Sequence, residues 1–465
     1  MSRRVPVMKV VNEGMLRPTL FVVVILMGAV HCTKAAERPP NVLLIISDDQ
    51  AWTDYGFMGH PIIRTPYLDR LASQSAVFER GYVPTALCRP SLATIITGLY
   101  AHQHGLTGND PSPLRYEPRS PLYDKMREKM IERIDRLGTL PRWLQAKGYQ
   151  SFQSGKWWEG SYLRGGFTHG MTRGFPQPGG RHGDDGLEIG RKGLEPVFQF
   201  IQSAKAADKP FFLWYAPMMP HTPHNPPERL LAYYRDRTPS LHVARYYGMC
   251  EWFDETCGAL LEYLDRQGLS DETLVIYVAD NGWIQDPDGP QFALRSKQSP
   301  YEGGVRQPIL VRWPGKIAPE RRRDLVSSID IAPTVLAAAG LPIPEELPGI
   351  NLLPFLQQRR PIPRDTLFGE TFAHDVADVD DPQESLLYRW VIHDRWKLLL
   401  SYDGDPGRHA ALHPRGDLSP QLFDLIADPH EQHNVAKEHP ELVQSLAKKI
   451  ESWWPVTTRR TRLEP

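Results

Sequence analysis

One stretch of the chain, residues 87–98, combines a lone cysteine with the start of a predicted helix. Cys88 stands just before Pro90, and proline suits the first turn of a helix because its missing N–H costs nothing there. The free N–H groups and the dipole at a helix N-terminus favour negative charge. We therefore predict that Cys88 begins a helix, at a place suited to a deprotonated nucleophile or to a bound sulfate or phosphate. A buried structural thiol is the alternative for a cysteine taken alone.

Acidic residues follow two apolar runs that read as buried parallel strands. Asp48 and Asp49 come after residues 41–47, and Asp280 with Asn281 comes after residues 273–279. In open α/β sheets ligands bind at the carboxyl ends of the strands. Adjacent carboxylates repel each other unless a cation lies between them, and oxygen ligands suit Ca²⁺ or Mg²⁺. The pattern predicts a divalent metal site, although caps and turns also use these residues.

A lysine and a histidine follow two further predicted strands. Lys156 comes after residues 149–153 and is followed by two tryptophans, so that it can clamp an oxyanion at a strand end. His221 follows the apolar run 210–216 and lies between prolines that restrict the backbone and aim the imidazole. Such a histidine is suited to proton transfer near neutral pH. A solvated lysine and a histidine that only packs are the alternatives.

These segments, in this order, resemble the formylglycine-dependent sulfatases of the alkaline phosphatase-like superfamily. Within the cysteine stretch the matching residues are Cys88, Pro90, Ser91, Thr97 and Gly98. The resemblance implies that a maturation enzyme oxidises Cys88 to formylglycine, whose hydrate attacks the sulfate ester. It implies that Lys156, His221 and Lys297 are catalytic, Lys297 because it precedes a Tyr-Glu-Gly-Gly segment by four residues. It also implies a calcium or magnesium site made by Asp48, Asp49, Cys88, Asp280 and Asn281.

Two positions depart from the family pattern. Leu92 stands where the family has an arginine that supports the formylglycine, and Trp158 stands where it has a histidine that helps to release sulfate. We expect other residues to take these roles or to bind substrate. The candidates are Arg89 beside Cys88, and the histidines His102, His104, His169 and His224.

The order of elements predicts an α/β fold, with a large central, mostly parallel sheet flanked by helices as in alkaline phosphatase-like proteins. A small C-terminal α+β subdomain, with an antiparallel sheet and a last helix, is expected to follow. We predict a signal peptide over residues 1–36, a catalytic domain over 37–365 and the C-terminal subdomain over 366–465. Residues 109–136 read as a polar surface excursion, and the glycine-rich stretch 165–193 reads as a long loop near the mouth of the site.

Composition limits the partners and the compartment. The 465 residues carry 54 Lys+Arg against 55 Asp+Glu, which excludes the strong basic field of a nucleic-acid-binding protein. Basic residues, a short apolar run and small side chains over residues 1–36 predict export to the periplasm or the medium. A lipoprotein or an N-terminal membrane anchor is the alternative. Cys250 and Cys257 lie in a predicted helix roughly 10 Å apart, too far for a disulfide.

Three functions remain open from the sequence. The first is an exported sulfatase that acts on a sulfated carbohydrate. The second is a phosphodiesterase or phosphonate hydrolase on the same scaffold. The third is an inactive relative that only binds sulfated glycans, because two family residues are missing at Leu92 and Trp158.

Overall fold

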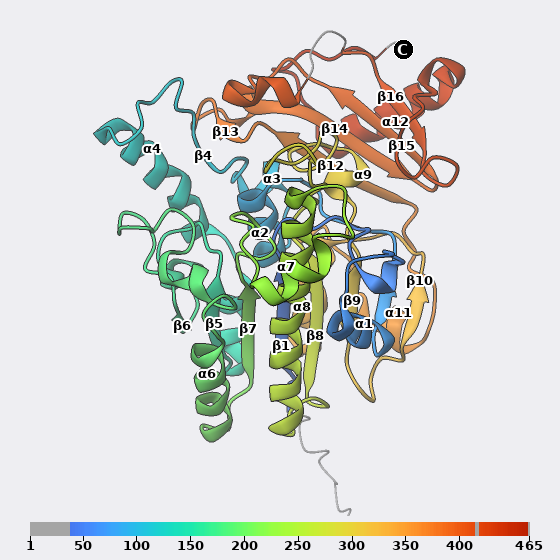
Figure 1. The fold of residues 1–465 in the computed structure, drawn as a ribbon. Coiled ribbons are helices and arrows are strands. Elements are labelled where there is room, and N and C mark those ends of the chain that lie inside the picture. The colour runs from blue at the N-terminus through green and yellow to red at the C-terminus, as the bar shows by residue number, and fades with distance from the viewer. Residues whose placement is uncertain (1–37, 414–417, 464–465) are drawn as a thin grey trace, which may run out of the picture. The chain divides into compact units, whose positions relative to one another are not determined.

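The computed structural model describes residues 38–413 and 418–463 (Figure 1). One compact unit comprises Pro39–Pro465. The predicted signal peptide, residues 1–36, lies outside the described residues. Within the described part of the chain, no helix is both long and apolar enough to cross a membrane.

An eight-stranded sheet forms the centre of the unit, in the order β10-β2-β9-β8-β1-β7-β5-β6. The neighbours β8, β1, β7, β5 and β6 run parallel to one another, whereas β9 runs antiparallel to both β8 and β2. The predicted large, mostly parallel sheet is thus confirmed. Its strands are β1 (Asn41–Ser47), β2 (Ala76–Phe78), β5 (Gln150–Gly155), β6 (His169–Gly170), β7 (Phe211–Ala216), β8 (Thr273–Ala279), β9 (Ile309–Arg312) and β10 (Glu320–Arg322).

Helices cover both faces of this sheet, so its central strands are apolar throughout. Alternate side chains of β1 point to opposite faces, as the pleat requires. Val42, Leu44 and Ile46 pack in one apolar cluster with α2 (Cys88–Thr97), α5 (Leu140–Leu144) and α10 (Ile331–Ala338). Leu43 and Ile45 pack in a second cluster with α1 (Pro66–Ser73), α6 (Glu195–Ala206) and α8 (Leu241–Arg266). Burying each such side chain stabilises the fold by about 1.5–3 kcal/mol.

Helix boundaries follow local signals in the sequence. Thr65 precedes α1 and Pro66 is its first residue, and Gly98 ends α2 in the left-handed conformation that glycine favours. Residues 109–136, predicted as a polar surface excursion, include the helix α4 (Pro121–Ile131). The hydroxyl of Ser120 accepts the N–H of Tyr123 and caps this helix, a signal that the sequence already carried. The other helices are α3 (Ala101–His104), α7 (Glu228–Tyr234), α9 (Glu302–Val305) and α11 (Leu353–Gln357).

A four-stranded antiparallel sheet with a helix packed on it forms the C-terminal part, as expected. Val443, Leu446 and Ile450 of α12 (Pro440–Trp453) are buried against the sheet. A domain boundary at residue 365 stays a prediction. The strands of this sheet are β12 (Thr366–Phe372), β14 (Leu386–His393), β15 (Trp396–Ser401) and β16 (Gln421–Asp424). Two small two-stranded sheets pair β3 (Gly81–Tyr82) with β11 (Val326–Ser327) and β4 (Asp110–Pro111) with β13 (Asp375–Val376).

Candidate active site

Two neighbouring parallel strands bring four polar side chains together at their carboxyl ends. Ser47 of β1 pairs with Ala279 of β8, so the residues that follow them are adjacent. The backbone N–H of Asp49 donates to the Asp280 carboxylate over 3.1 Å, and the Asn281 amide donates to the Asp49 carboxylate over 2.7 Å. Asp48, Asp49, Asp280 and Asn281 are all buried.

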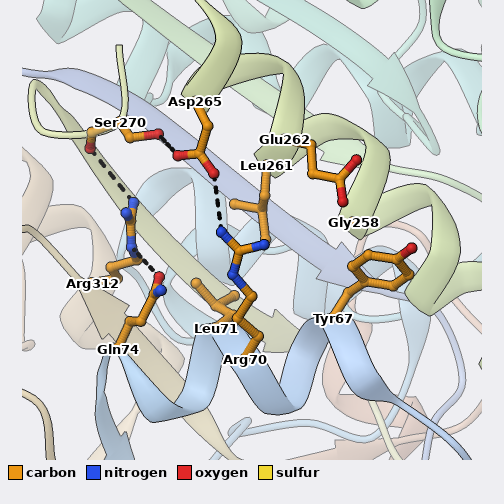
Figure 2. A pocket seen from close by; sticks show the side chains of 10 residues that line it. All are labelled: Tyr67, Arg70, Leu71, Gln74, Gly258, Leu261, Glu262, Asp265, Ser270 and Arg312. Atoms are coloured by element: carbon orange, nitrogen blue, oxygen red, sulfur yellow. Dashed lines mark hydrogen bonds and ion pairs between the residues drawn. The ribbon is translucent and has the colours of Figure 1, made fainter. Parts of the chain in front are cut away.

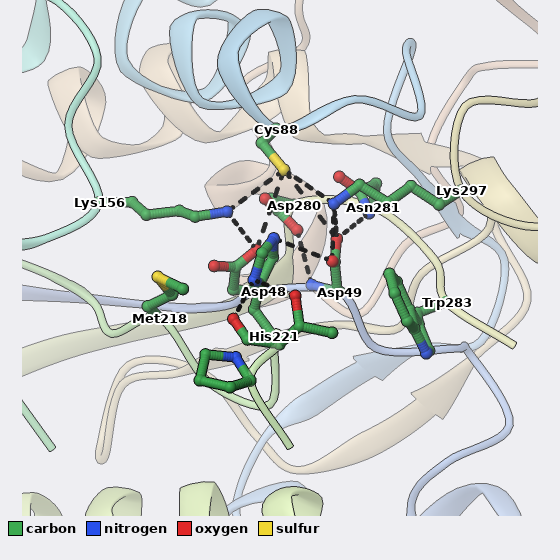
Figure 3. A network of polar contacts seen from close by, with 12 residues as sticks. Asp48, Asp49, Cys88, Lys156, Met218, His221, Asp280, Asn281, Trp283 and Lys297 are labelled. Atoms are coloured by element: carbon green, nitrogen blue, oxygen red, sulfur yellow. Dashed lines mark hydrogen bonds and ion pairs between the residues drawn. The ribbon is translucent and has the colours of Figure 1, made fainter. Parts of the chain in front are cut away.

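The thiol of Cys88 lies directly opposite these strand ends (Figure 3). Cys88 is the first residue of α2, as predicted from Pro90. Its Sγ lies 4.0 Å from carboxylate oxygens of both Asp48 and Asp49. Lys156 and Lys297 enter from opposite sides, with their Nζ atoms 3.3 Å and 3.2 Å from this sulfur.

Each lysine also contacts one carboxylate of the strand ends. Lys156 Nζ lies 2.7 Å from Asp48 Oδ1, and Lys297 Nζ lies 2.6 Å from the Asp49 carboxylate. Burial opposes the charged form of both lysines, but Asp48 and Asp49 raise the pKa of Lys156 and of Lys297, respectively. Both ammonium groups are therefore held protonated at the sulfur.

Backbone geometry fixes the approach of Lys156. Gly155 ends β5 with a φ of +82°, and a Cβ atom there would lie 1.8 Å from the carbonyl oxygen of Ala216. Only glycine fits this conformation and this close contact. The N–H of Lys156 donates to the same oxygen over 2.7 Å. Asp49 also has a positive φ, 66°, which is uncommon for a residue with a side chain and is typical of functional sites.

The neighbouring carboxylates at the strand ends repel one another, which changes their pKa values. Burial raises the pKa of Asp48 well above its ordinary value, and the charges of Asp280 and Asp49 raise it further. Burial also opposes ionisation of Asp49, but Lys297, His221 and Lys156 hold its pKa well below the usual range. Burial raises the pKa of Asp280. The two lysines therefore compensate only part of the negative charge.

Three buried oxygen atoms at the strand ends lack any hydrogen-bond partner: Asp48 Oδ2, Asp280 Oδ2 and Asn281 Oδ1. A buried acceptor without a partner costs free energy. Ligand atoms of Asp48, Asp49, Cys88 and His221 lie within 4.8 Å of one another. Carboxylate and amide oxygens are the ligands that Ca²⁺ and Mg²⁺ prefer. The residues present thus fit a divalent cation.

His221 faces the same cluster through one ring nitrogen. Its Nε2 lies 3.3 Å from the Asp49 carboxylate, and its Nδ1 lies 2.7 Å from the carbonyl oxygen of Thr222. Because a carbonyl only accepts, Nδ1 keeps its proton, and Nε2 is the nitrogen that gains or loses one. Burial, followed by the charge of Lys156, lowers the pKa of His221 well below its ordinary value.

The sequence around this site matches known family models. A family model described as "Sulfatase" matches residues 40–341, and one described as "N-sulphoglucosamine sulphohydrolase, C-terminal" matches residues 291–454. The chain belongs to the sulfatase family. It is a sulfuric ester hydrolase with an alkaline phosphatase-like fold.

Individual relatives cover most of this sulfatase. Arylsulfatase A of Homo sapiens is 31% identical, covering 89% of this chain and 87% of that protein. N-acetylgalactosamine-6-sulfatase of Homo sapiens is 28% identical over 89% of this chain and 84% of that protein. Among solved structures, Ps i-CgsB in complex with k-i-k-neocarrahexaose is 25% identical, with a TM-score of 0.70 over 90% of this chain and 94% of that chain.

The two departures of the sulfatase from the family pattern are both buried. Leu92 is 4% exposed in the cluster that α2 forms against the sheet, so no charge occupies this position. Trp158 is buried, and its ring centroid lies 5.1 Å from that of His182. His182 belongs to the glycine-rich stretch 165–193, which does reach the site, since its carbonyl accepts the N–H of Trp157 over 3.1 Å.

Arg89, expected to replace the missing arginine, is not brought to the thiol. Its guanidinium is fully buried and binds Glu159 through Nε at 2.8 Å and a terminal nitrogen at 2.6 Å. A further terminal nitrogen donates to the carbonyl oxygen of Asn109 over 3.3 Å. The charge of Arg89 is thus neutralised by Glu159 in the protein interior. The sequence did not predict this partner, because Glu159 is 70 residues away.

Two of the candidate histidines, His104 and His102, bind other residues, and a third, His169, is exposed. His104 is buried at the end of α3, where it contacts Thr94 at 3.2 Å and accepts the N–H of Leu106. His102 binds Glu370 at 2.7 Å. His169 is exposed on the edge strand β6.

His224 lies nearer the cluster than these three. Its ring packs on Tyr246 and on Trp283, with centroids 5.3 and 5.6 Å apart. Lys297 Nζ lies 5.6 Å from the centroid of the same Trp283 ring. Trp283 was not predicted as a site residue, although it lies only two positions after Asn281.

A small pocket lies away from this site, between α1 and α8 (Figure 2). It shares no residue with the cysteine cluster. Its polar side chains bind one another: Arg70 lies 3.2 Å from Asp265, and Arg312 donates to Gln74 over 3.0 Å. We assign it no role in the reaction.

Proposed function

We propose that this sulfatase is exported and hydrolyses sulfate esters of carbohydrates, using a formylglycine made from Cys88. The observation that carries the proposal is the position of the Cys88 sulfur, 3.3 and 3.2 Å from two lysine nitrogens and 4.0 Å from two carboxylates. A sulfate ester has three nonbridging oxygens that share one negative charge, and fixed ammonium groups beside a carboxylate-held cation are suited to binding them.

Each residue of the cluster then has a distinct task. Asp48, Asp49, Asp280 and Asn281 would hold a divalent cation, which supplies Lewis-acid polarisation of the sulfate when bound. Oxygen-only protein ligands and an extracytoplasmic setting favour calcium. Lys156 and Lys297 hold the remaining sulfate oxygens and oppose the charge that develops on them. His221 transfers a proton through Nε2; because the neutral ring carries its proton on Nδ1, Nε2 must take up a proton before it can give one to the leaving oxygen.

The nucleophile requires a modified Cys88. The three cysteines within the described residues are all free thiols, so none is tied up in a disulfide. Burial raises the pKa of the Cys88 thiol to about 12, although Lys156 and Lys297 lower it. A thiol with so high a pKa is a poor nucleophile at neutral pH. This supports oxidation by a maturation enzyme before the protein acts.

Substrate class and export come from the relatives and the N-terminal sequence. One relative is named an N-acetylgalactosamine-6-sulfatase, and a similar solved structure holds k-i-k-neocarrahexaose. Both names support a sulfated carbohydrate as substrate. The pattern of basic, apolar and small residues over 1–36 supports a signal peptide and a periplasmic or secreted protein.

Parallel ester assays test the proposal. The protein is coexpressed with a formylglycine-generating enzyme and supplied with p-nitrophenyl sulfate, p-nitrophenyl phosphate and a phosphonate monoester, with calcium present. We expect kcat/KM to be highest for the sulfate ester, and Cys88→Ala to abolish all turnover. A preference for the phosphate or phosphonate ester would overturn the assignment. Full conversion without turnover, but with binding of sulfated glycans, would indicate an inactive relative.

A further inference from the structure

Two buried carboxylates lie side by side on the small sheet that β4 and β13 form. Asp110 of β4 is the direct register partner of Asp375 of β13. The two residues are 3% and 1% exposed. Two adjacent buried carboxylates require positive charge around them.

Each carboxylate binds an arginine that projects toward solvent. Arg181 Nε lies 3.1 Å from both carboxylate oxygens of Asp110, and Arg408 Nε lies 2.6 Å from Asp375 Oδ2. The side chains of these arginines are 45% and 50% exposed. We call Arg181 and Arg408 the rim arginines. Each guanidinium is thus anchored by a buried carboxylate while half of its side chain stays open to solvent.

Arg181 and the segment that carries Asp110 both connect to the neighbourhood of Cys88, and Arg408 joins them through Asp375, the register partner of Asp110. The guanidinium carbon of Arg181 lies 4.6 Å from the ring centroid of Trp158, two residues after Lys156. The Asn109 side chain accepts the backbone N–H of Arg89, the residue after Cys88, over 3.1 Å. The segment that carries Asp110 is thus tied to α2, and the segment that carries Arg181 is tied to the Lys156 strand end.

Positive charge exceeds negative charge in this group. Arg127, buried on α4, also binds Asp110, so that three guanidiniums face two carboxylates. Several buried nitrogens there have no hydrogen-bond partner, among them His182 Nδ1, Arg127 Nε and His409 Nε2. Burial lowers the pKa of His182 to about 3, with Lys156 and Arg181 adding to the effect. The group therefore carries excess positive charge, and of its three guanidiniums those of Arg181 and Arg408 reach solvent.

A metal ion does not fit this place. Ligand atoms of His374, Asp375 and His409 lie within 4.8 Å of one another. Both oxygens of Asp375 are engaged, however, because Oδ1 is bound by His374 at 2.6 Å and by Arg408 at 3.1 Å, and Oδ2 by Arg408. A second cation would meet the repulsion of the Arg408 guanidinium.

We propose that the rim arginines Arg181 and Arg408 form a subsite for a second anionic group on the saccharide whose sulfate ester reaches Cys88. Asp110 and Asp375 already bind the Nε and one terminal nitrogen of each guanidinium, so an anionic group of the saccharide would meet the other terminal nitrogen. Carboxylates and sulfates are the acidic groups that saccharides carry, and both accept hydrogen bonds from guanidinium. The inference rests on the proposed function and narrows its substrate to oligosaccharides with at least two negative charges.

Matched disaccharides test the subsite. One joins a uronic acid to a sulfated hexosamine, and the other is its carboxyl-reduced, neutral-uronide analogue. A second pair compares a doubly sulfated with a singly sulfated hexosamine, which separates a sulfate-binding from a carboxylate-binding subsite. We expect KM of the converted enzyme to be about tenfold lower for the more anionic member of at least one pair, the worth of one charge-assisted hydrogen bond.

Variants assign the preference to the rim arginines. In Arg181→Ala and in Arg408→Ala, the ratio of the KM values for the less and the more anionic member of a pair should fall toward one. Arg181→Lys should retain part of the preference for the more anionic member. Arg395→Ala is the matched control, since Arg395 is 44% exposed and binds Asp424 in the same manner far along the chain. Melting temperatures of all variants confirm that they fold.

The outcomes separate the subsite from the proposed function. Equal KM values within both pairs, in an enzyme that releases sulfate, would overturn the subsite and leave the function standing. Were no sulfate ester hydrolysed, the same pairs would be compared by calorimetric binding to Cys88→Ser protein. Tighter binding of the more anionic disaccharide that Arg181→Ala removes would then support the subsite but not the proposed function. Equal binding of both members of each pair would overturn the subsite.

Discussion

Lys297 joins Asp49 to Cys88. Its Nζ lies 2.6 Å from the Asp49 carboxylate and 3.2 Å from the Cys88 sulfur, although these residues are 248 and 209 positions away in the chain. One ammonium group therefore neutralises a metal-site carboxylate and faces the reacting atom. Lys156 repeats this relationship with Asp48 from the other side.

Loss of Lys297 should impair the reaction more than the fold. In Lys297→Ala we expect kcat/KM for a sulfate ester to fall by about 10² to 10³, because one preorganised charge at the transition state is gone. Initial rates of sulfate release by the converted enzyme measure the effect. Lys192→Ala, which removes a lysine that is 70% exposed, is the control and should keep full activity. Activity of Lys297→Ala within threefold of the parent would contradict this role.

Calcium should stabilise the protein through the strand-end oxygens. Binding relieves repulsion among Asp48, Asp49 and Asp280 and supplies partners for the unpaired oxygens. At a free calcium concentration about 100 times Kd the gain is about 2.7 kcal/mol, and we expect Tm to rise by about 3 °C or more. Thermal melts in calcium and in chelator check this.

The matched variants for calcium binding are two aspartate-to-asparagine changes. Asp280→Asn removes a strand-end carboxylate and should lose most of the calcium-dependent shift. Asp288→Asn changes an exposed residue eight positions later and should keep it. If the unsubstituted protein melts at the same temperature in calcium and in chelator, that result would argue against a metal site.

The Arg89–Glu159 ion pair should matter for stability. Arg89→Ala leaves the Glu159 carboxylate buried without its partner, and we expect the free energy of unfolding to fall by about 3–5 kcal/mol. Denaturant unfolding measures this. Arg89→Met combined with Glu159→Gln removes both charges and should be less damaging than Arg89→Ala. A stable Arg89→Ala protein with a raised KM would instead make Arg89 a substrate-binding residue.

His104 should make the fold sensitive to acid. Burial lowers the pKa of His104 to about 3, below about 6.5 in an unfolded chain. Protonation therefore favours unfolding: the contribution of His104 is complete above pH 6.5 and is lost as the pH falls below that value. Between pH 8 and pH 5 the loss is about 2 kcal/mol.

Denaturant unfolding at the two pH values tests this contribution. His104→Gln should show a smaller loss between pH 8 and pH 5 than the parent protein. His433→Gln replaces an imidazole that is 80% exposed and should behave like the parent. If His104→Gln and the parent lose the same free energy of unfolding, the buried neutral histidine is not what makes the protein acid-sensitive.

Much of the central fold could be predicted because its signals are local. The apolar runs before Asp48 and Asp280 become β1 and β8, and parallel neighbours necessarily bring their carboxyl ends together. Pro90 likewise indicates that Cys88 begins α2. For these elements, the local sequence is enough to predict which residues come together at the site.

Partners that are distant in sequence could not be predicted. From the sequence, Arg89 is predicted to have a charge available for substrate, but in the folded protein it is bound by Glu159. Asp110 looks like one polar residue in a polar stretch, and its pairing with Asp375 joins segments 265 residues apart. No pattern of spacing signals such a contact, because it depends on how two loops pack. The rim arginines follow only from that packing.

Conversion of Cys88 gives the most direct test of the central claim. The protein is prepared with graded amounts of formylglycine-generating enzyme, and mass spectrometry of the peptide that contains Cys88 gives the fraction of thiol replaced by aldehyde. We predict that sulfate release from an ester rises in proportion to that fraction and extrapolates to zero for unmodified thiol. Full activity with an unmodified Cys88, or none after complete conversion, would contradict the account.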